Sequence, residues 1–307
     1  GDSDHTKLID MLTDLNDYSI GIEDVLKEHF DEENIVYWMA FQILMGNVDT
    51  QNRNVYLYSP LNSDIWYFIA WDNDGCLMRP EYELRNFSDQ NSWEKGISNY
   101  WGNILFQRCL KSRSFREKLN DAILDLREYL NKDMLTSKIE SYKNVLKPYL
   151  YLMPDAEYEP LTSEQYDQIA ASLPDEIEKN YQLYLESLET PMPFYIGVPT
   201  IDGDKLKFNW DVSYDLDAED ITYSVEVAGD YLFRDVIYQN TTLTVPEAEM
   251  DLPKAGQYFV RVRATNTSGK TQDAFDYYVT DEGKYYGMRC FYITEDSTVE
   301  EDDYEEG

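Results

Sequence analysis

The sequence predicts an α+β protein of more than one domain, with a mostly helical first part and an all-β second part. Apolar residues recur at helical spacing through much of the first 190 residues. Pro191 and Pro193 then interrupt the chain, and from Phe194 onward apolar and polar residues alternate as in half-buried strands. With 307 residues, the chain is long enough for two domains that each bury a core.

The first expected elements are one or two short helices over residues 7–30, with Gly21 breaking the pattern. Asp31 opens a longer, apolar helix, because its carboxylate can cap the free N–H groups of the first turn. Gly46 ends that helix in the usual C-terminal manner. Asp49 therefore lies in the loop directly after a buried helix, where a rigid scaffold positions exposed chemistry.

A β-hairpin is expected next. Residues 55–59 and 65–71 are rich in aromatic and β-branched side chains, and the Pro-Leu-Asn-Ser-Asp segment between them is typical of a turn. This hairpin would bring Asn54, before its first strand, close to Asp72, after its second. A purely structural interpretation is that both residues cap the hairpin and that Asp74-Gly75 forms a turn.

The remaining helical part begins with a polar loop over residues 79–99. Trp93 in this loop, and Tyr100 and Trp101 directly after it, are expected to pack on the helical core, with anchoring of an ordered loop near the site as the alternative. Three further helices are predicted, over residues 104–130, 134–146 (stopped by Pro148) and 163–188.

The second part is expected to be a β-sandwich, because short strands follow one another at regular spacing. Leu206, Phe208 and Trp210 lie on one face of the first clear strand. Trp210 is expected in the core, and Tyr258 is expected in the core or at a corner. The acidic residues Asp211, Asp215, Asp217, Glu219 and Asp220 lack the ligand spacing of a Ca²⁺-binding loop, so a solvated loop is predicted there. Residues 286–307 are expected to be an acidic tail, which from Glu295 onward is expected to be disordered or a linker toward a further segment.

The candidate chemistry lies between Gly46 and Met78. Asp49 and Asn54 have the spacing Asp-x-x-x-x-Asn, and Asp72 and Asp74 follow the second expected strand. In kinase-type phosphotransferases one carboxylate accepts the proton of the attacking hydroxyl, while an amide oxygen and a later carboxylate hold Mg²⁺ against the nucleotide phosphates.

Two runs flank this pattern: Asn-Val-Tyr-Leu-Tyr over residues 54–58 and Trp-Tyr-Phe-Ile-Ala-Trp-Asp-Asn-Asp over residues 66–74. Together with the acidic spacing, they resemble the signature of the CotH (spore coat protein H) kinase family, whose members are atypical, secreted or surface-associated bacterial protein kinases. Residues 192–285 similarly resemble a bacterial fibronectin type III module, on the Trp210 strand and the Tyr-Phe-Val-Arg-Val-Arg-Ala-Thr-Asn-Thr-Ser-Gly run.

The CotH resemblance implies a role for each residue of the motif. Asp49 takes the place of the catalytic aspartate, and Asn54 and Asp72 take the places of the metal and nucleotide ligands. Asp74, the second acid of the Trp-Asp-x-Asp pattern, is implied as a further metal ligand. The implied cofactors are Mg²⁺ (or Mn²⁺) and ATP, and the implied substrate is a surface or coat protein outside the cell. Val48 and Gly75 depart from the family's usual pattern.

A kinase also needs a strand-rich cover over the phosphates, with a lysine that pairs them. The residues before Asp49 read as helical, and their only lysines, Lys7 and Lys27, have no glycine-rich turn nearby. We therefore expect residues 1–190 to be the catalytic-loop half of a CotH-type kinase domain, without its nucleotide lobe and inactive by itself.

The composition limits the classes of partner and site that the chain could have. Sixty acidic against 26 basic residues give a formal charge of −34, which argues against nucleic acid, because binding a polyanion requires Lys and Arg. No apolar run approaches the roughly 20 residues of a membrane span. Cys76, Cys109 and Cys290 have no metal or disulfide spacing, and the two histidines, His5 and His29, offer no zinc site.

Two other functions stay open. A surface scaffold or adhesion protein with a vestigial kinase-like domain would suit the acidic surface and the fibronectin-like module. A carbohydrate-active enzyme could use Asp72 and Asp74 as paired carboxylates, although glycosidases normally place the two groups across a cleft.

Overall fold

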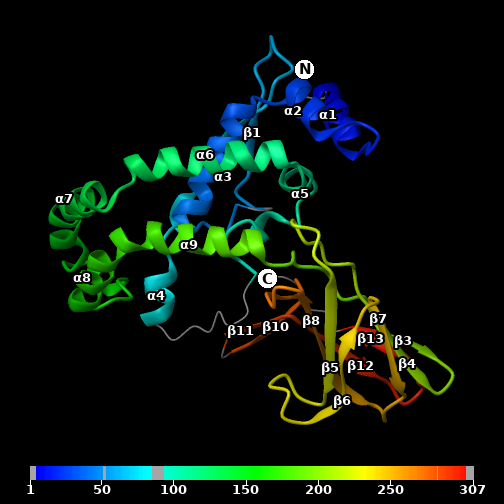
Figure 1. The fold of residues 1–307 in the computed structure, drawn as a ribbon. Helices are drawn as coiled ribbons and strands as arrows, with labels where there is room; N and C mark the ends of the chain where they lie inside the picture. The colour runs from blue at the N-terminus through cyan, green and yellow to red at the C-terminus, as the bar shows by residue number, and fades with distance from the viewer. Residues whose placement is uncertain (1–4, 51–52, 85–92, 282, 302–307) are drawn as a thin grey trace. The chain divides into compact units, whose positions relative to one another are not determined.

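The computed structural model describes residues 5–50, 53–84, 93–281 and 283–301, and the chain forms two compact units (Figure 1). The first unit comprises residues 1–86 and 95–185, and the second comprises residues 87–94 and 186–307. Helices dominate the first unit and antiparallel sheets the second. The predicted α+β class is therefore confirmed.

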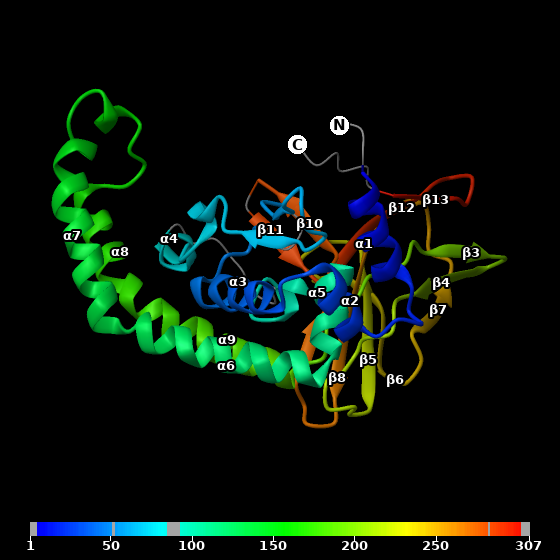
Figure 2. The same cartoon turned by 90° about the horizontal axis from the view of Figure 1, so that it is seen from above.

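The first unit contains the following helices: α1 (Thr6–Asn16), α2 (Ile22–His29), α3 (Glu32–Met45), α4 (Arg79–Leu84), α5 (Ile104–Lys111), α6 (Arg113–Tyr129), α7 (Lys132–Leu150), α8 (Ser163–Ser172) and α9 (Glu176–Glu189), whose last residues fall within the second unit. Helices α6 and α9 lie side by side, with α7 and α8 beyond their ends (Figures 1 and 2). Arg127 of α6 joins the two helices, since its guanidinium pairs with Glu178 and covers the ring of Tyr181 at 3.6 Å.

Helix α3 forms the centre of the first unit and packs against α6. Both of its predicted ends are confirmed. The Asp31 side chain accepts a hydrogen bond from the Asn34 N–H, and Gly46 ends the helix in the left-handed conformation at φ 59°. Ile35, Met39 and Leu44 are fully buried, so α3 is a core helix that holds the loop after Gly46 in a fixed place.

The predicted hairpin is also confirmed. Strands β1 (Tyr56–Tyr58) and β2 (Tyr67–Ile69) pair antiparallel, with Leu57 opposite Phe68. The Asn34 side chain of α3 bonds both backbone groups of Phe68: Nδ2 donates to its carbonyl at 3.2 Å and Oδ1 accepts from its N–H at 2.7 Å. Asn34 thus fixes the hairpin to α3.

Some helix boundaries differ from the prediction. The segment 104–130 is broken at Ser112, whose hydroxyl accepts from the Phe115 N–H and starts a new helix. The segment 163–188 is broken by a 3₁₀ turn, Leu173–Asp175, that contains Pro174. Pro148, by contrast, lies within α7. It sits in the last turn, where its missing N–H removes a single helical bond.

The second unit contains two sheets that share one apolar core. Strands β3 (Thr200–Asp202), β4 (Lys205–Asn209) and β7 (Glu247–Asp251) form the smaller sheet, in the order β3-β4-β7. The larger has the order β13-β12-β8-β5-β6, with β5 (Ile221–Ala228), β6 (Val236–Leu243), β8 (Gly256–Asn266), β12 (Met288–Ile293) and β13 (Val299–Glu301). Leu206 and Phe208 of β4 pack in one cluster with Val225 of β5 and Val262 of β8.

Two aromatic residues of this unit occupy their expected places. Trp210 is buried in the shared core, at 5 % exposure. The Tyr258 hydroxyl donates to the Lys254 carbonyl at 2.9 Å, four residues upstream, as in a tyrosine corner. In the acidic loop, Asp215 accepts from the N–H groups of Asp217 and Glu219, which is a structural use of its carboxylate.

The sheet continues past residue 285. Strand β12 pairs with β8 from Met288↔Arg261 to Ile293↔Gly256, and Phe291 is fully buried in the core. The described part of the expected tail therefore contains strands, because Met288, Cys290, Phe291 and Ile293 supply apolar side chains that the neighbouring acidic residues obscure in the sequence. Residues 302–307 lie outside the described residues.

Between β8 and β12 the chain inserts β9 (Thr271–Asp273), β10 (Tyr277–Thr280) and β11 (Gly283–Tyr286), of which β10 and β11 form a hairpin. Trp93 packs here, not on the helical core as expected: its indole N–H donates to the Phe275 carbonyl at 3.0 Å. Glu94 pairs with Lys284 at 3.0 Å and accepts from the Tyr286 hydroxyl at 2.6 Å. Tyr100 and Trp101 are buried in the first unit.

Within the described residues, no helix is both long and apolar enough to cross a membrane. Cys76, Cys109 and Cys290 are all free thiols.

Candidate functional site

The loop that carries Asp49 is fixed by a buried amide. Asn47 is 2 % exposed, and its Nδ2 donates to Gln42 Oε1 of α3 at 3.0 Å. Its Oδ1 accepts from the Asp49 N–H at 3.1 Å. Thr50, also buried, lies 3.1 Å from the Tyr100 hydroxyl. The backbone on both sides of Asp49 is therefore anchored, while the Asp49 side chain is exposed.

The loop that carries Asp72 and Asp74 is tied to the same amides. Asn73 Oδ1 accepts from Gln42 Nε2 at 3.1 Å and from Asn47 Nδ2 at 3.4 Å. Asp72 has the left-handed backbone (φ 49°) that Asp and Asn tolerate better than most residues, and it precedes the 3₁₀ turn Asn73–Gly75. The Gln42–Asn47–Asn73 amide network thus holds the two acidic loops together.

Sequence reasoning missed this network. One signal was available, because Gln42 is a polar residue on a helix face that is otherwise apolar. A buried amide needs hydrogen-bond partners, so such a residue indicates a polar network in the core. The partners themselves, Asn47 and Asn73, could not be identified from their positions in the sequence.

The structure brings Asp49, Asp72 and Asp74 together. The negative charge of Asp74 raises the pKa of Asp72, and slight burial and the charge of Asp49 act in the same direction. Gly75 allows this approach, since a Cβ there would lie only 2.9 Å from Asn47 Oδ1 and 3.6 Å from Asp49 Oδ2. Gly75, a departure from the family pattern, is therefore where the two loops touch.

Asn54 lies at the same end of the hairpin as Asp72. Tyr56 pairs with Ile69, and Asn54 and Trp71 each lie two residues beyond that pair. Asn54 is half-buried and left-handed, at φ 53°. That Asn54 and Asp72 share one ion stays a prediction.

The side chains of the two acidic loops are oxygen donors for a divalent metal. In the part of the chain that the structure describes, no three His, Cys, Asp or Glu side chains form a ready metal-binding group. The site instead brings the carboxylates of Asp49, Asp72 and Asp74 within electrostatic reach of one another, and the amide of Asn54 stays a predicted further donor. Oxygen donors of this kind fit Mg²⁺, which is usually held by one or two carboxylates plus substrate phosphates. Mutual repulsion among the three carboxylates also favours a cation beside Asp72.

An aromatic surface adjoins the acids. One face of the hairpin, the one that does not carry Phe68, presents four apolar side chains that are between 43 % and 54 % exposed: Tyr56, Tyr58, Ile69 and Trp71. The rings of Tyr56 and Trp71 lie 5.0 Å apart. Exposed apolar side chains grouped in this way are typical of a binding surface, and Trp71 directly precedes Asp72.

Lys7 serves the hairpin structurally. Its ammonium donates to Ser59 Oγ at 3.0 Å and to the carbonyls of Pro60 and Ser63 in the hairpin turn. One of the two lysines that precede Asp49 is therefore engaged by the backbone of the turn.

A second polar network joins the segment that carries the site to helix α9. Arg79, after the second acidic loop, pairs with Glu176 at 3.1 Å and donates to Asn180 Oδ1 at 2.8 Å. Asn180 Nδ2 in turn donates to the Leu44 carbonyl at the end of α3 at 2.9 Å. Both Glu176 and Asn180 are buried, so α9 holds the two ends of the site segment.

Comparison with known proteins agrees with the motif. The family model described as CotH kinase protein matches residues 1–184. The chain belongs to this family. No curated protein matches it.

Two solved structures have a distant likeness to this CotH family member. The twitchin kinase region from C. elegans (Fn31-NL-kin-CRD-Ig26) is 16 % identical with a TM-score of 0.23, covering 31 % of this chain and 20 % of that one. The surface layer protein SbsC, domains 1–6, is 12 % identical with a TM-score of 0.18, covering 92 % and 32 %. At these scores neither likeness bears on fold or function, and the chain spans under a third of either relative.

Proposed function

We propose that this CotH family protein contributes the catalytic-loop side of a site that transfers the γ-phosphate of ATP to a protein hydroxyl. The supporting observation is the meeting of the Asp49 loop and the Asp72–Asp74 loop on one amide network. Two loops that lie apart in sequence and expose clustered carboxylates suit phosphoryl transfer, where catalysis rests on positioning and electrostatics.

In this proposal Asp49 accepts the proton of the attacking hydroxyl, and its anchored backbone keeps the carboxylate in place. Asn54, Asp72 and Asp74 would hold Mg²⁺, which when bound neutralises negative charge on the nucleotide phosphates. The Tyr56–Trp71 pair would provide a surface on which the nucleotide base stacks.

Among the described residues before Asp49 there are helices and no strand. A strand-rich cover for the phosphates is thus not supplied by them, and we expect slow or absent phosphate transfer by this chain alone. Metal binding is therefore the decisive measurement on this chain.

The test is Mn²⁺ binding, followed by calorimetry and electron paramagnetic resonance, with and without ATP. We expect weak binding that ATP strengthens, loss of it in Asp72→Asn, and no change in Asp64→Asn, an exposed aspartate in the hairpin turn. Tight binding that Asp72→Asn leaves unaltered would place the ion elsewhere on this acidic chain and would contradict the proposal.

A second candidate is a surface scaffold whose kinase-like part is inactive. It draws support from the second unit, which we propose to be a fibronectin III-like module on the basis of its two sheets and the Tyr258 corner. Such modules commonly serve as spacers in secreted or surface proteins, which is also where we propose this protein acts. Absence of specific Mn²⁺ binding in the test above would favour this candidate.

A further inference from the structure

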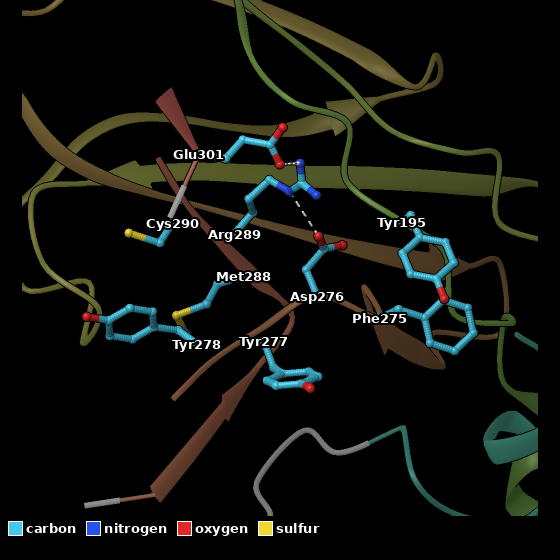
Figure 3. A pocket seen from close by; sticks show the side chains of 9 residues that line it. All are labelled: Tyr195, Phe275, Asp276, Tyr277, Tyr278, Met288, Arg289, Cys290 and Glu301. Carbon is cyan, nitrogen blue, oxygen red and sulfur yellow. Dashed lines mark hydrogen bonds and ion pairs between the residues drawn. The ribbon is translucent and has the colours of Figure 1, made fainter. Parts of the chain in front are cut away.

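The second unit contains a pocket of about 240 Å³, formed where the insertion between β8 and β12 meets the edge of the larger sheet (Figure 3). Its lining comes from Tyr195, from the stretch Phe275 to Tyr278, from Met288 to Cys290 on β12, and from Glu301 on β13. Pockets for drug-sized ligands measure roughly 300–1,000 Å³, so this one suits a single small ring.

A row of three charged side chains forms the polar part of the pocket (Figure 3). Arg289 Nε donates to Asp276 Oδ1 at 3.1 Å, and Arg289 Nη1 pairs with Glu301 Oε2 at 3.3 Å. The second carboxylate oxygen of Asp276 is also engaged, since Oδ2 accepts a hydrogen bond from the Ile196 N–H at 2.8 Å. The row is thus fixed in place before any ligand arrives.

The row still has unused hydrogen-bonding capacity. Within the described residues, Arg289 Nη2 and Glu301 Oε1 make no hydrogen bond, and neither do the hydroxyls of Tyr195 and Tyr277. A donor and an acceptor therefore lie side by side, which suits a ligand that carries several hydroxyl groups, because each hydroxyl both donates and accepts.

Aromatic side chains form the apolar part. Tyr195 is 54 % exposed and packs on Phe275 with ring centroids 4.7 Å apart. Tyr277, at 38 % exposure, carries the Lys284 ammonium 4.1 Å from its ring centre. Exposed aromatic rings beside hydrogen-bonding groups match a ligand with both apolar faces and polar edges.

The alternating charges disfavour charged small ligands. An anion would meet two carboxylates, and a cation would meet the guanidinium of Arg289 between them. We propose that this pocket binds a neutral sugar ring, as one residue of an oligosaccharide, with the tyrosines against its faces and Arg289 and Glu301 on its hydroxyls. This site is independent of the phosphotransfer site.

The test uses the full chain and saturation-transfer NMR with neutral oligosaccharides of glucose, xylose and N-acetylglucosamine. An acidic oligogalacturonate and a trilysine peptide serve as charged comparators. We expect transfer to at least one neutral sugar, and about tenfold weaker binding in Tyr195→Ala and in Tyr277→Ala, as loss of one aromatic contact implies.

Tyr214→Ala is the matched control, because Tyr214 is 41 % exposed in the same unit but does not line the pocket. Arg289→Lys keeps the charge while removing the forked donor, and it should also weaken binding. Unchanged thermal midpoints would show that the variants fold. The proposal would be overturned if the protein bound trilysine but no neutral sugar, or bound none of these ligands. Equal sugar binding by Tyr277→Ala and the wild type would also overturn it.

Discussion

At the scale of single residues, the carboxylates of the acidic site repel one another. Asp49, Asp72 and Asp74 lie close enough for the pKa of Asp72 to be raised, although all three side chains are exposed. Proteins keep such unfavourable groupings mainly where a bound cation or a reaction uses them.

Asp72→Asn should therefore raise the thermal midpoint of the metal-free protein at low ionic strength, since it removes one of three repelling carboxylates. Asparagine also accepts the left-handed backbone at this position, so the substitution adds no strain. Differential scanning fluorimetry in chelator measures the shift, which should shrink in ~1 M salt because salt screens exposed charges. Asp64→Asn is the control; a lowered midpoint in Asp72→Asn would contradict the repulsion argument.

Substitution of Arg79 tests how much its polar network with Glu176 and Asn180 stabilises the first unit. Arg79→Ala leaves Glu176, 1 % exposed, with Lys179 as its remaining ionic partner among the described residues, and it removes the hydrogen bond that Asn180 Oδ1 accepts. Losing one partner of a buried ion pair costs about 3–5 kcal/mol, and we expect a smaller loss of roughly 1–3 kcal/mol here because Lys179 stays.

Urea unfolding measures this loss. Arg113→Ala is the matched control, because Arg113 pairs with Glu117 on an exposed helix face and should contribute about 0–1 kcal/mol. Equal effects of the two substitutions would show that the Arg79 network carries no stability.

At the scale of elements, the hairpin depends on one amide of α3. Asn34→Ala would leave the N–H and carbonyl of the buried Phe68 without their partner, at a cost of about 1–3 kcal/mol. Hydrogen exchange should show faster exchange of the Phe68 amide in this variant. The control, Asn144→Ala on the exposed face of α7, should leave the exchange rate of the Phe68 amide unaltered. An unaltered rate in Asn34→Ala would show that other contacts hold the hairpin.

The same elements show what the sequence could and could not predict. The cap at Asp31, the stop at Gly46 and the hairpin follow from local rules, because each depends on neighbouring residues. The Gln42–Asn47–Asn73 network depends on long-range packing, which residue types at fixed spacing do not specify. Strand β12 was missed for another reason: its apolar residues stand just before the acidic run that dominates the composition there.

At the scale of the whole molecule, the second unit is discontinuous in sequence, since it includes Trp93 and Glu94. Trp93→Ala should destabilise this unit by roughly 3–5 kcal/mol, because the indole is 6 % exposed and packs on Phe275 and Tyr286. Calorimetry should show one transition moving and the other, from the first unit, staying. Trp71→Ala, at an exposed tryptophan, is the control; a shift of both transitions would mean that the units do not unfold separately.

This discontinuity also has a consequence during synthesis. Trp93 and its partner Phe275 are 182 residues apart. A ribosome adds roughly 5–20 residues per second, so the indole leaves the exit tunnel about 10–40 s before the residues that will cover it. For that interval the nascent chain exposes a large apolar side chain, while the helical unit becomes complete only when residue 185 has emerged, about half-way through it. Residues around Trp93 are thus where we expect chaperones to engage the growing polypeptide.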